Sequence, residues 1–170
     1  MKTLILLRHA KSSWGDPAAS DFDRPLNARG VEAARAMGRE IRRHALAFDH
    51  VLASPAARTV QTVAGLGNGE DAAAEYDSRL YLASVNTLVH VVRAADDSHE
   101  RLLIVGHNPG LAELALLFSG GGALRDQVAT KFPTGALAEI RFDAARWRDL
   151  AEGEGTLARF IRPRDLAPEA

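Results

Sequence analysis

The chain has 170 residues, with 21 basic and 22 acidic side chains and no cysteine. This length fits one domain with a sizeable core, and the net charge of −1 gives no overall field to attract nucleic acid or an anionic membrane. The missing cysteines exclude disulfides and every cysteine nucleophile. The first apolar run, residues 3–7, is too short for a signal peptide. No stretch approaches the roughly 20 apolar residues of a membrane span, so we expect a soluble cytoplasmic protein.

Strands and helices are predicted to alternate along the chain. Strands are expected at residues 3–7, 51–52, 74–77, 101–106, 136–142 and 156–161, with helices from Asn27 to about 44 and at 55–63, 85–95 and 111–118, and a glycine-rich turn at 65–71. Such alternation predicts an α/β fold of three layers, α/β/α, with a mainly parallel sheet in the middle. We expect one domain over residues 1–162 and a loose C-terminal tail over residues 163–170.

Cationic side chains follow three of the expected strands. Arg8 and His9 come directly after the strand at 3–7, His107 follows the strand at 101–106, and Arg58 lies in the first turn of the helix after the strand at 51–52. In open α/β sheets, ligands bind beyond the carboxyl ends of the strands. We therefore expect these four side chains to open onto one crevice, where they would bind a dianion beside a nucleophile.

The helices that follow two of these strands strengthen this interpretation. Ser54 and Asn108 are suitable N-caps, and the proline after each suits the first helical position. His107 then lies beside a helix N-terminus, whose free amides favour an anion. Each feature also has an ordinary interpretation, as an exposed arginine or a hydrogen-bonded histidine at a turn. Their combination is more specific than any one of them.

The same segments resemble the motifs of a known family. Arg8-His9-Ala10 resembles the Arg-His-Gly signature of the histidine phosphatase superfamily, with alanine in place of glycine. Ser54-Pro55-x-x-Arg58-x-x-x-Thr62 resembles its second arginine segment, and Gly106-His107-Asn108-Pro109 resembles its second histidine segment. The short length and Ser20-Asp21-x-x-Arg24-Pro25-Leu26 are similar to the SixA-type phosphohistidine phosphatases.

The resemblance spans nearly the whole chain and implies a phosphoglycerate mutase-like fold, with residues 1–162 as a single histidine phosphatase domain. It also implies that His9 is the nucleophile that becomes phosphorylated. Arg8, Arg58 and His107 would bind the phosphoryl group, with Asn108 beside them.

The chain departs from the family at the general acid. Many branches carry a glutamate where this chain has Leu82. Asp21 and Asp23, in the loop after the first strand, are the nearest substitutes, and Arg24 is a candidate substrate contact; the two aspartates alternatively accept backbone hydrogen bonds in the loop. Trp14 in the same loop either lines the mouth of the site or packs in the core or on the surface. Without a placed acid, an alkoxide leaves slowly, whereas neutral imidazole leaves readily, which predicts a preference for phosphohistidine over alkyl phosphate esters.

We therefore expect a phosphatase that needs neither metal nor cofactor, acts through a phosphohistidine intermediate and takes phosphohistidine as substrate. The alternatives are a small-molecule phosphomonoesterase or mutase of the same superfamily and a phosphate-binding module without turnover. A metal enzyme is disfavoured because two arginines would repel a dication beside the histidines. The partner would be a phosphorylated protein or a small phosphorylated substrate. The sequence sets neither the substrate nor the oligomeric state.

Overall fold

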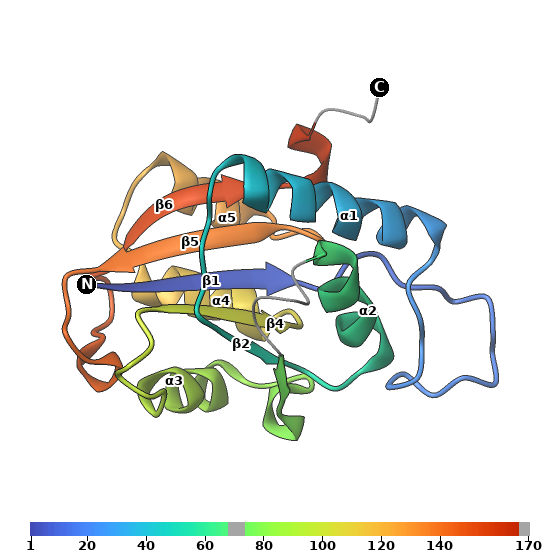
Figure 1. Ribbon diagram of the computed structural model, residues 1–170, viewed down its shortest axis with the longest axis horizontal. Coiled ribbons are helices and arrows are strands. Elements are labelled where there is room, and N and C mark those ends of the chain that lie inside the picture. The colour runs from blue at the N-terminus through green and yellow to red at the C-terminus, as the bar shows by residue number, and fades with distance from the viewer. Residues whose placement is uncertain (68–73, 167–170) are drawn as a thin grey trace.

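A six-stranded mixed sheet forms the centre of the protein (Figure 1). The structure, a computed structural model, describes residues 1–67 and 74–166. The strands are β1 (Lys2–Arg8), β2 (His50–Ala53), β3 (Glu75–Tyr76), β4 (Arg101–Gly106), β5 (Leu137–Phe142) and β6 (Thr156–Ile161), in the spatial order β3-β2-β4-β1-β5-β6. The pairs β3·β2, β2·β4 and β4·β1 are parallel, whereas β5 runs antiparallel to both of its neighbours. The sheet is therefore mainly parallel, as predicted.

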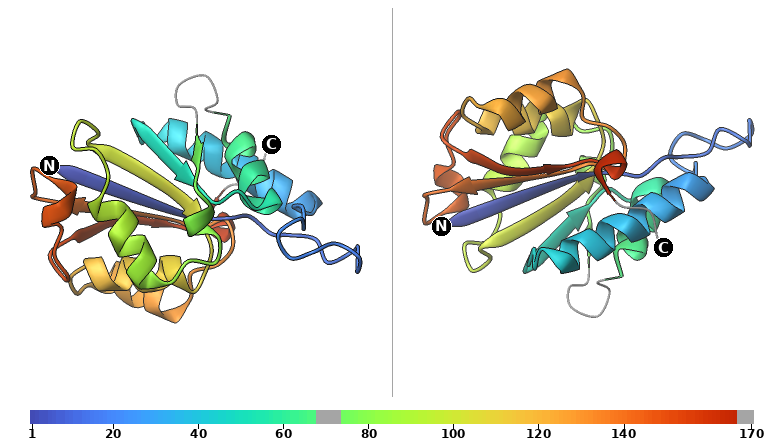
Figure 2. Two further views of the ribbon diagram at one scale, coloured as in Figure 1. Left: turned by 90° about the horizontal axis from the view of Figure 1, so that it is seen from below. Right: turned by 90° about the horizontal axis from the view of Figure 1, so that it is seen from above.

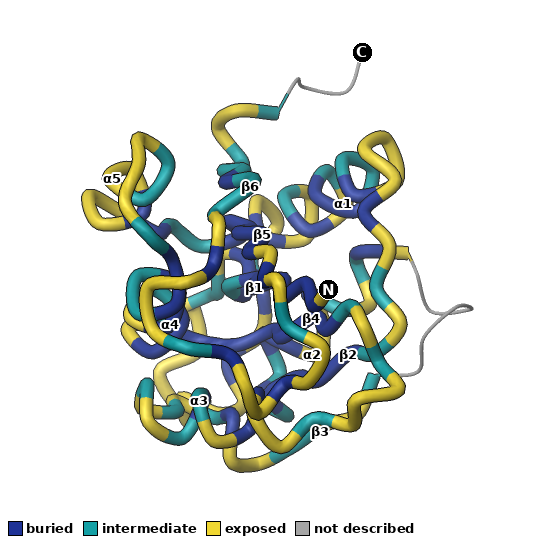
Figure 3. The backbone as a smooth tube through the Cα atoms, turned by 90° about the vertical axis from the view of Figure 1, so that its left-hand side faces the viewer, coloured by how far each residue is buried: buried dark blue, intermediate teal, exposed yellow. Residues whose placement is uncertain are grey.

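Helices cover both faces of the sheet (Figure 2). On one face, α1 (Ala28–Arg43) and α2 (Ala57–Leu66) pack over Ile5 and Leu7 of β1. On the other face, α3 (Val85–Arg93), α4 (Gly110–Phe118) and α5 (Ala123–Thr130) pack over Leu4 and Leu6. Because successive strand side chains point to opposite faces, a strand covered on both sides must be apolar at every position. This explains the run at 3–7 and confirms the predicted three-layer α/β/α fold; the central strands are correspondingly buried (Figure 3).

Three adjacent parallel strands bring their carboxyl ends to one edge of the sheet. Arg8 is level with Gly106 in the β1·β4 pair, and Ala53 is level with Val105 in the β2·β4 pair. The pairing continues one residue beyond the strands, because the His9 amide donates to the Gly106 carbonyl at 3.0 Å. The loop after β1 projects from this end of the molecule (Figure 2). Residues far apart in the sequence are thereby gathered at one place.

The helix starts differ from the prediction. The second helix, α2, begins at Ala57 with Ala56 as its cap, so the prediction of a Ser54 cap followed by Pro55 is wrong. The hydroxyl of Ser54 instead accepts from the Ala56 amide and pairs with His107. In α4 the cap is Pro109 rather than Asn108, although the Asn108 side chain still accepts from the Ala112 amide at 3.2 Å. The helix α5 was not predicted at all.

The segment after β6 is more ordered than a loose tail. Residues Pro163–Asp165 form a 3-10 turn in which Arg162 pairs with Asp165 at 2.8 Å, and Leu166 packs against the core on the α1 side. The domain boundary at residue 162 stays a prediction. Residues 167–170 of the predicted tail lie outside the described residues, as do residues 68–71 of the predicted turn. Among the helices of the described residues, none is long and apolar enough to cross a membrane.

Candidate functional site

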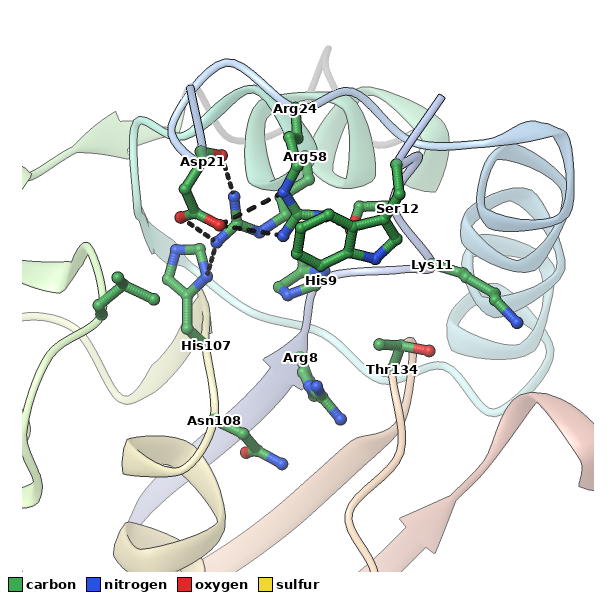
Figure 4. A pocket seen from close by; sticks show the side chains of 12 residues that line it. Arg8, His9, Lys11, Ser12, Asp21, Arg24, Arg58, His107, Asn108 and Thr134 are labelled. Atoms are coloured by element: carbon green, nitrogen blue, oxygen red, sulfur yellow. Dashed lines mark hydrogen bonds and ion pairs between the residues drawn. The ribbon is translucent and has the colours of Figure 1, made fainter. Parts of the chain in front are cut away.

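A pocket of about 410 Å³ lies at the edge where β1, β2 and β4 end (Figure 4). Its lining includes Arg8, His9, Asp21, Arg24, Arg58, His107 and Asn108. The other candidate acid, Asp23, does not line the pocket, and its carboxylate accepts from the Ser20 hydroxyl at 2.8 Å. The pocket is within the size range of small-ligand sites. The structure thus brings these side chains together, while their individual roles stay predictions. Trp14, for which two positions were open, also lines this pocket, together with Leu82.

His9 is buried and held in a single orientation. Its Nδ1 lies 2.7 Å from the carbonyl oxygen of Ala10, which can only accept a hydrogen bond, so Nδ1 carries the proton. The lone pair is therefore on Nε2. The pKa of His9 is lowered to about 4, mainly because the ring is buried, and the positive charges of Arg58 and Arg8 contribute to this shift. The ring is neutral at pH 7, and its Nε2 is available as a nucleophile.

His107 lies beside His9, with 5.2 Å between the ring centroids. Its Nδ1 accepts from a guanidinium N–H of Arg58 at 3.3 Å, which leaves Nε2 to donate to the Ser54 hydroxyl at 2.8 Å. Burial lowers the pKa of His107 to about 3, assisted by the neighbouring His9 and Arg58. Two neutral histidines thus face one pocket among arginine side chains.

Two arginines of the pocket, Arg8 and Arg58, have N–H groups without a hydrogen-bond partner among the described residues. One terminal nitrogen of Arg8 donates to the Phe132 carbonyl at 3.0 Å, and Asn108 donates to the same oxygen at 2.9 Å. The Nε atoms of Arg8 and Arg58 are buried and have no hydrogen-bond partner within the described part of the chain. Burial lowers the pKa of Arg8, and the charge of Arg58 adds to this effect. Because buried polar groups are normally satisfied, these unpaired N–H groups indicate a site for an anion.

Asp21 connects the pocket cations (Figure 4). Its carboxylate accepts from Arg24 at 3.1 Å, from Arg58 at 3.1 Å and from the hydroxyl of Tyr81. The Tyr81 hydroxyl is the main reason that the pKa of Asp21 falls to about 2, and Arg24 and Arg58 contribute further. The carboxylate is therefore ionised at pH 7. In the free protein it holds no proton to donate, although a role as general acid stays a prediction to test.

Two contacts in the site were missed by the sequence reasoning. The sequence assigned no role to Tyr81, yet its hydroxyl reaches Asp21, and its ring packs edge-to-face with the ring of His107 at a centroid distance of 5.4 Å. The hydroxyl of Thr62 accepts from the Ala10 amide at 3.0 Å and donates to the Arg58 carbonyl at 2.7 Å. Thr62 thereby links α2 to the residue after His9. The signal for Thr62 was its fixed distance from Arg58 in the motif.

The rim of the pocket is apolar where an acid was expected. Leu82 has a φ of 48° and is 55% exposed. Trp14 is 78% exposed, and its ring packs against the guanidinium of Arg24 at 3.6 Å from the centroid. Across residues 1–67 and 74–166, no group of three or more histidine and acidic side chains could hold a metal ion. The arrangement suits a phosphoryl dianion next to a neutral imidazole nucleophile.

Comparison with known proteins gives consistent matches. The sequence model of the histidine phosphatase superfamily (branch 1) matches residues 4–81. An uncharacterized protein of Mycobacterium tuberculosis is 38% identical over 93% of this chain and 100% of its own length. A structure from Nakamurella multipartita, provisionally named phosphohistidine phosphatase SixA, has a TM-score of 0.84 and 32% identity, covering 95% of this chain and 96% of that one. A similarly named structure from Agrobacterium tumefaciens has a TM-score of 0.82 and 28% identity, covering 95% and 98%.

Proposed function

Since the chain belongs to the histidine phosphatase superfamily (branch 1), we propose that it is a SixA-type phosphatase that hydrolyses phosphohistidine through a covalent intermediate on His9. One observation carries this proposal. The imidazole of His9 is neutral and donates through Nδ1 to the Ala10 carbonyl, so its Nε2 lone pair is available in a pocket lined by arginines. The names of the relatives from Nakamurella multipartita and Agrobacterium tumefaciens support the same substrate class.

In the first step, the Nε2 lone pair of His9 attacks phosphorus in line with the bond to the substrate ring nitrogen. That P–N bond breaks, and its electron pair returns to the leaving imidazole. The N–H groups of Arg8 and Arg58 that lack partners among the described residues would bind the equatorial oxygens, where preorganised donors stabilise the transition state. A dianion in the pocket would also raise the pKa of His107, so that its ring gains a proton and becomes a further donor.

In the second step, water attacks the phosphoryl group on His9, and the P–Nε2 bond breaks to give inorganic phosphate. The hydrogen bond from Nδ1 to Ala10 has a role here too. It keeps the proton on Nδ1 while Nε2 carries the phosphoryl group, so the ring of the intermediate is positively charged. When the P–Nε2 bond breaks, its electron pair returns to Nε2 and the ring becomes neutral imidazole. A single backbone carbonyl therefore sets the tautomer for attack and maintains the labile form of the intermediate.

The leaving group decides between substrate classes. An alkyl ester expels an alkoxide that must be protonated as it leaves, whereas phosphohistidine protonated on its other ring nitrogen expels imidazole, whose conjugate acid has a pKa of about 6.5. Leu82 supplies no proton, and Asp21, the one carboxylate among the described residues that line the pocket, is ionised. These features favour phosphohistidine over a phosphomonoester such as phosphoserine.

The proposal is tested by phosphate release from a phosphohistidine peptide and from phosphoserine, before and after exhaustive chelation of metals. We expect faster turnover of phosphohistidine, no loss on chelation, and an acid-labile, base-stable label on His9 in quenched reactions. The variant His9→Ala should lose at least about a thousandfold in kcat, the scale seen when a nucleophile is removed. Full activity in His9→Ala, or a label on serine, would contradict the proposal.

A further inference from the structure

Trp14 is an exposed tryptophan held in a fixed position. One face of its indole packs against the guanidinium of Arg24, 3.6 Å from the ring centroid. Arg24 is itself 8% exposed and is anchored by the Ser12 hydroxyl at 2.7 Å and by Asp21 at 3.1 Å. Nevertheless 78% of Trp14 remains exposed, so most of the indole surface away from Arg24 is open to solvent. The protein therefore orients a large aromatic surface without covering it.

This surface belongs to the phosphoryl pocket. Trp14 and Leu82 line the same pocket as His9, and both are large apolar side chains left in water. Leu82 also has a positive φ of 48°, a conformation that is unfavourable for leucine. The rest of the lining is mainly polar or cationic, including Lys11, Arg24 and Arg58. Exposed apolar surface at a pocket rim commonly marks contact with a ligand, and here it belongs to the pocket that contains His9.

We infer that Trp14 is a specificity-determining residue whose open indole face stacks on the planar ring that carries the phosphoryl group. This inference rests on the proposed function and adds to it the element that recognises the leaving group. Stacking suits imidazole because the ring is planar and aromatic. It also suits the protonated, reactive form of phosphohistidine, because an indole face attracts a cationic ring. An alkyl phosphate offers no such ring.

A merely structural role for Trp14 makes a different prediction. If the indole served only to hold Arg24, its loss would affect every substrate to the same degree. Arg24 keeps its hydrogen bonds to Ser12 and Asp21 without the indole, so the polar side of the pocket should persist in the variant Trp14→Ala. The two roles are separated by substrates that share the P–N bond and differ in the ring.

The test compares free phosphohistidine with the phosphoramidate ion, which has the same P–N bond but no ring, in wild type, Trp14→Ala and Trp14→Phe. For phosphohistidine we expect Trp14→Ala to raise KM about five- to tenfold, the scale of one aromatic stacking contact, with kcat within about twofold. Phosphoramidate should keep its kcat/KM within about twofold, and Trp14→Phe should retain most of the wild-type preference. Tyr76→Ala is the matched control, because Tyr76 is an exposed aromatic on β3 that does not line this pocket.

A second measurement follows binding directly. The chain has two tryptophans, and the other, Trp147, is fully buried. The difference in emission between His9→Ala and the double variant His9→Ala/Trp14→Phe therefore reports on Trp14 without turnover. Phosphohistidine should quench this difference, whereas phosphoramidate should not.

The outcomes separate the inference from the function it rests on. If wild type releases no phosphate from either substrate, the proposed function fails and the inference with it. If wild type is active but Trp14→Ala affects both substrates equally, or neither, Trp14 is structural and the inference alone is overturned. It is also overturned if Trp14→Ala impairs only a phosphorylated protein and not free phosphohistidine, since the indole would then bind a partner surface rather than the ring.

Discussion

Arginine side chains cluster at two places in this protein, and their positive charges are compensated differently at each. In the sheet, the carboxylate of Glu139 on β5 is completely buried and receives three of them. Arg159 approaches at 3.0 Å, Arg141 at 3.2 Å and Arg101 at 3.5 Å. The cluster carries two excess positive charges, but its arginine side chains are between 32% and 47% exposed, so water solvates the excess. Nothing about this cluster requires a ligand.

The pocket reverses this arrangement. The Arg58 side chain is 3% exposed, while its partner Asp21 is 45% exposed. Part of the hydrogen bonding of Arg8 and Arg58 goes to neutral backbone carbonyls, which hold a guanidinium without cancelling its charge. The comparison teaches that the number of arginines does not identify an anion site. Buried cations with spare donors do, because only an incoming anion can compensate them.

The largest expected effect separates an arginine of the pocket from one of the Glu139 cluster. Arg58→Ala should lower kcat/KM for phosphohistidine by an amount equivalent to about 2–4 kcal/mol, the contribution of one preorganised donor to the transition state. Arg159→Ala should leave kcat/KM within about twofold, because Arg159 contacts only the distant carboxylate and His44 in the described residues. Steady-state kinetics on both variants provides the measurement. Near-normal turnover in Arg58→Ala would remove this residue from the site and with it the distinction between the clusters.

Removing the carboxylate charge of the Glu139 cluster should affect stability rather than catalysis. Glu139→Gln removes the buried charge on which three arginines converge, and we expect it to lower the free energy of unfolding by about 2 kcal/mol, as for charged hydrogen bonds. The cost stays below that of a fully buried broken pair, because the arginines can turn towards water. Urea unfolding measures it, with Glu32→Gln as the control, since the exposed Glu32–Arg39 pair should contribute less than about 1 kcal/mol. A loss of activity at unchanged stability would show that the Glu139 cluster is functional after all.

The same contrast explains what the sequence could predict. Strand burial and the charges directly after each strand are local features, and they led from the run at 3–7 to the pocket. Glu139 could not be recognised, because two of its three arginine partners, Arg101 and Arg159, come from the neighbouring parts of the sheet, β4 and β6. Tyr81 lies 60 residues from Asp21 in the sequence, and only the folded loop brings the two together. Ser54 was predicted as a helix cap from its type and position, but packing turned its hydroxyl towards His107.

The helix α5 was missed for a related reason. It has eight residues, of which only Val128 is buried, and it follows three consecutive glycines. Such a short helix is stabilised mainly by its tertiary neighbours rather than by its own propensity. Its existence therefore depends on α4 and β6, which pack against it.

The smallest expected effect concerns Asp21. This carboxylate pairs with Arg58, so it is the feature of the pocket that most resembles the Glu139 cluster. Because its pKa is lowered to about 2, Asp21 is charged in the free protein. We expect it to position Arg58 and at the same time to repel an incoming dianion. Asp21→Asn should then lower kcat about tenfold on phosphohistidine and phosphoserine alike, an effect on the order of 1.4 kcal/mol, while inhibition by vanadate becomes stronger.

Stability gives an independent reading of the same carboxylate. A depressed carboxyl pKa stabilises the folded protein above the unfolded pKa of about 3.9, and this contribution is lost as the pH falls towards the folded pKa. The difference in urea stability between wild type and Asp21→Asn should therefore shrink between about pH 4 and pH 2, and it should be small throughout because the side chain is 45% exposed. A general acid would act differently in the kinetics, since its loss slows only the substrate whose leaving group needs a proton. If Asp21→Asn slowed the turnover of phosphoserine but not that of phosphohistidine, Asp21 would be the general acid of this site. The carboxylate would then have to gain its proton when the substrate displaces it from Arg58.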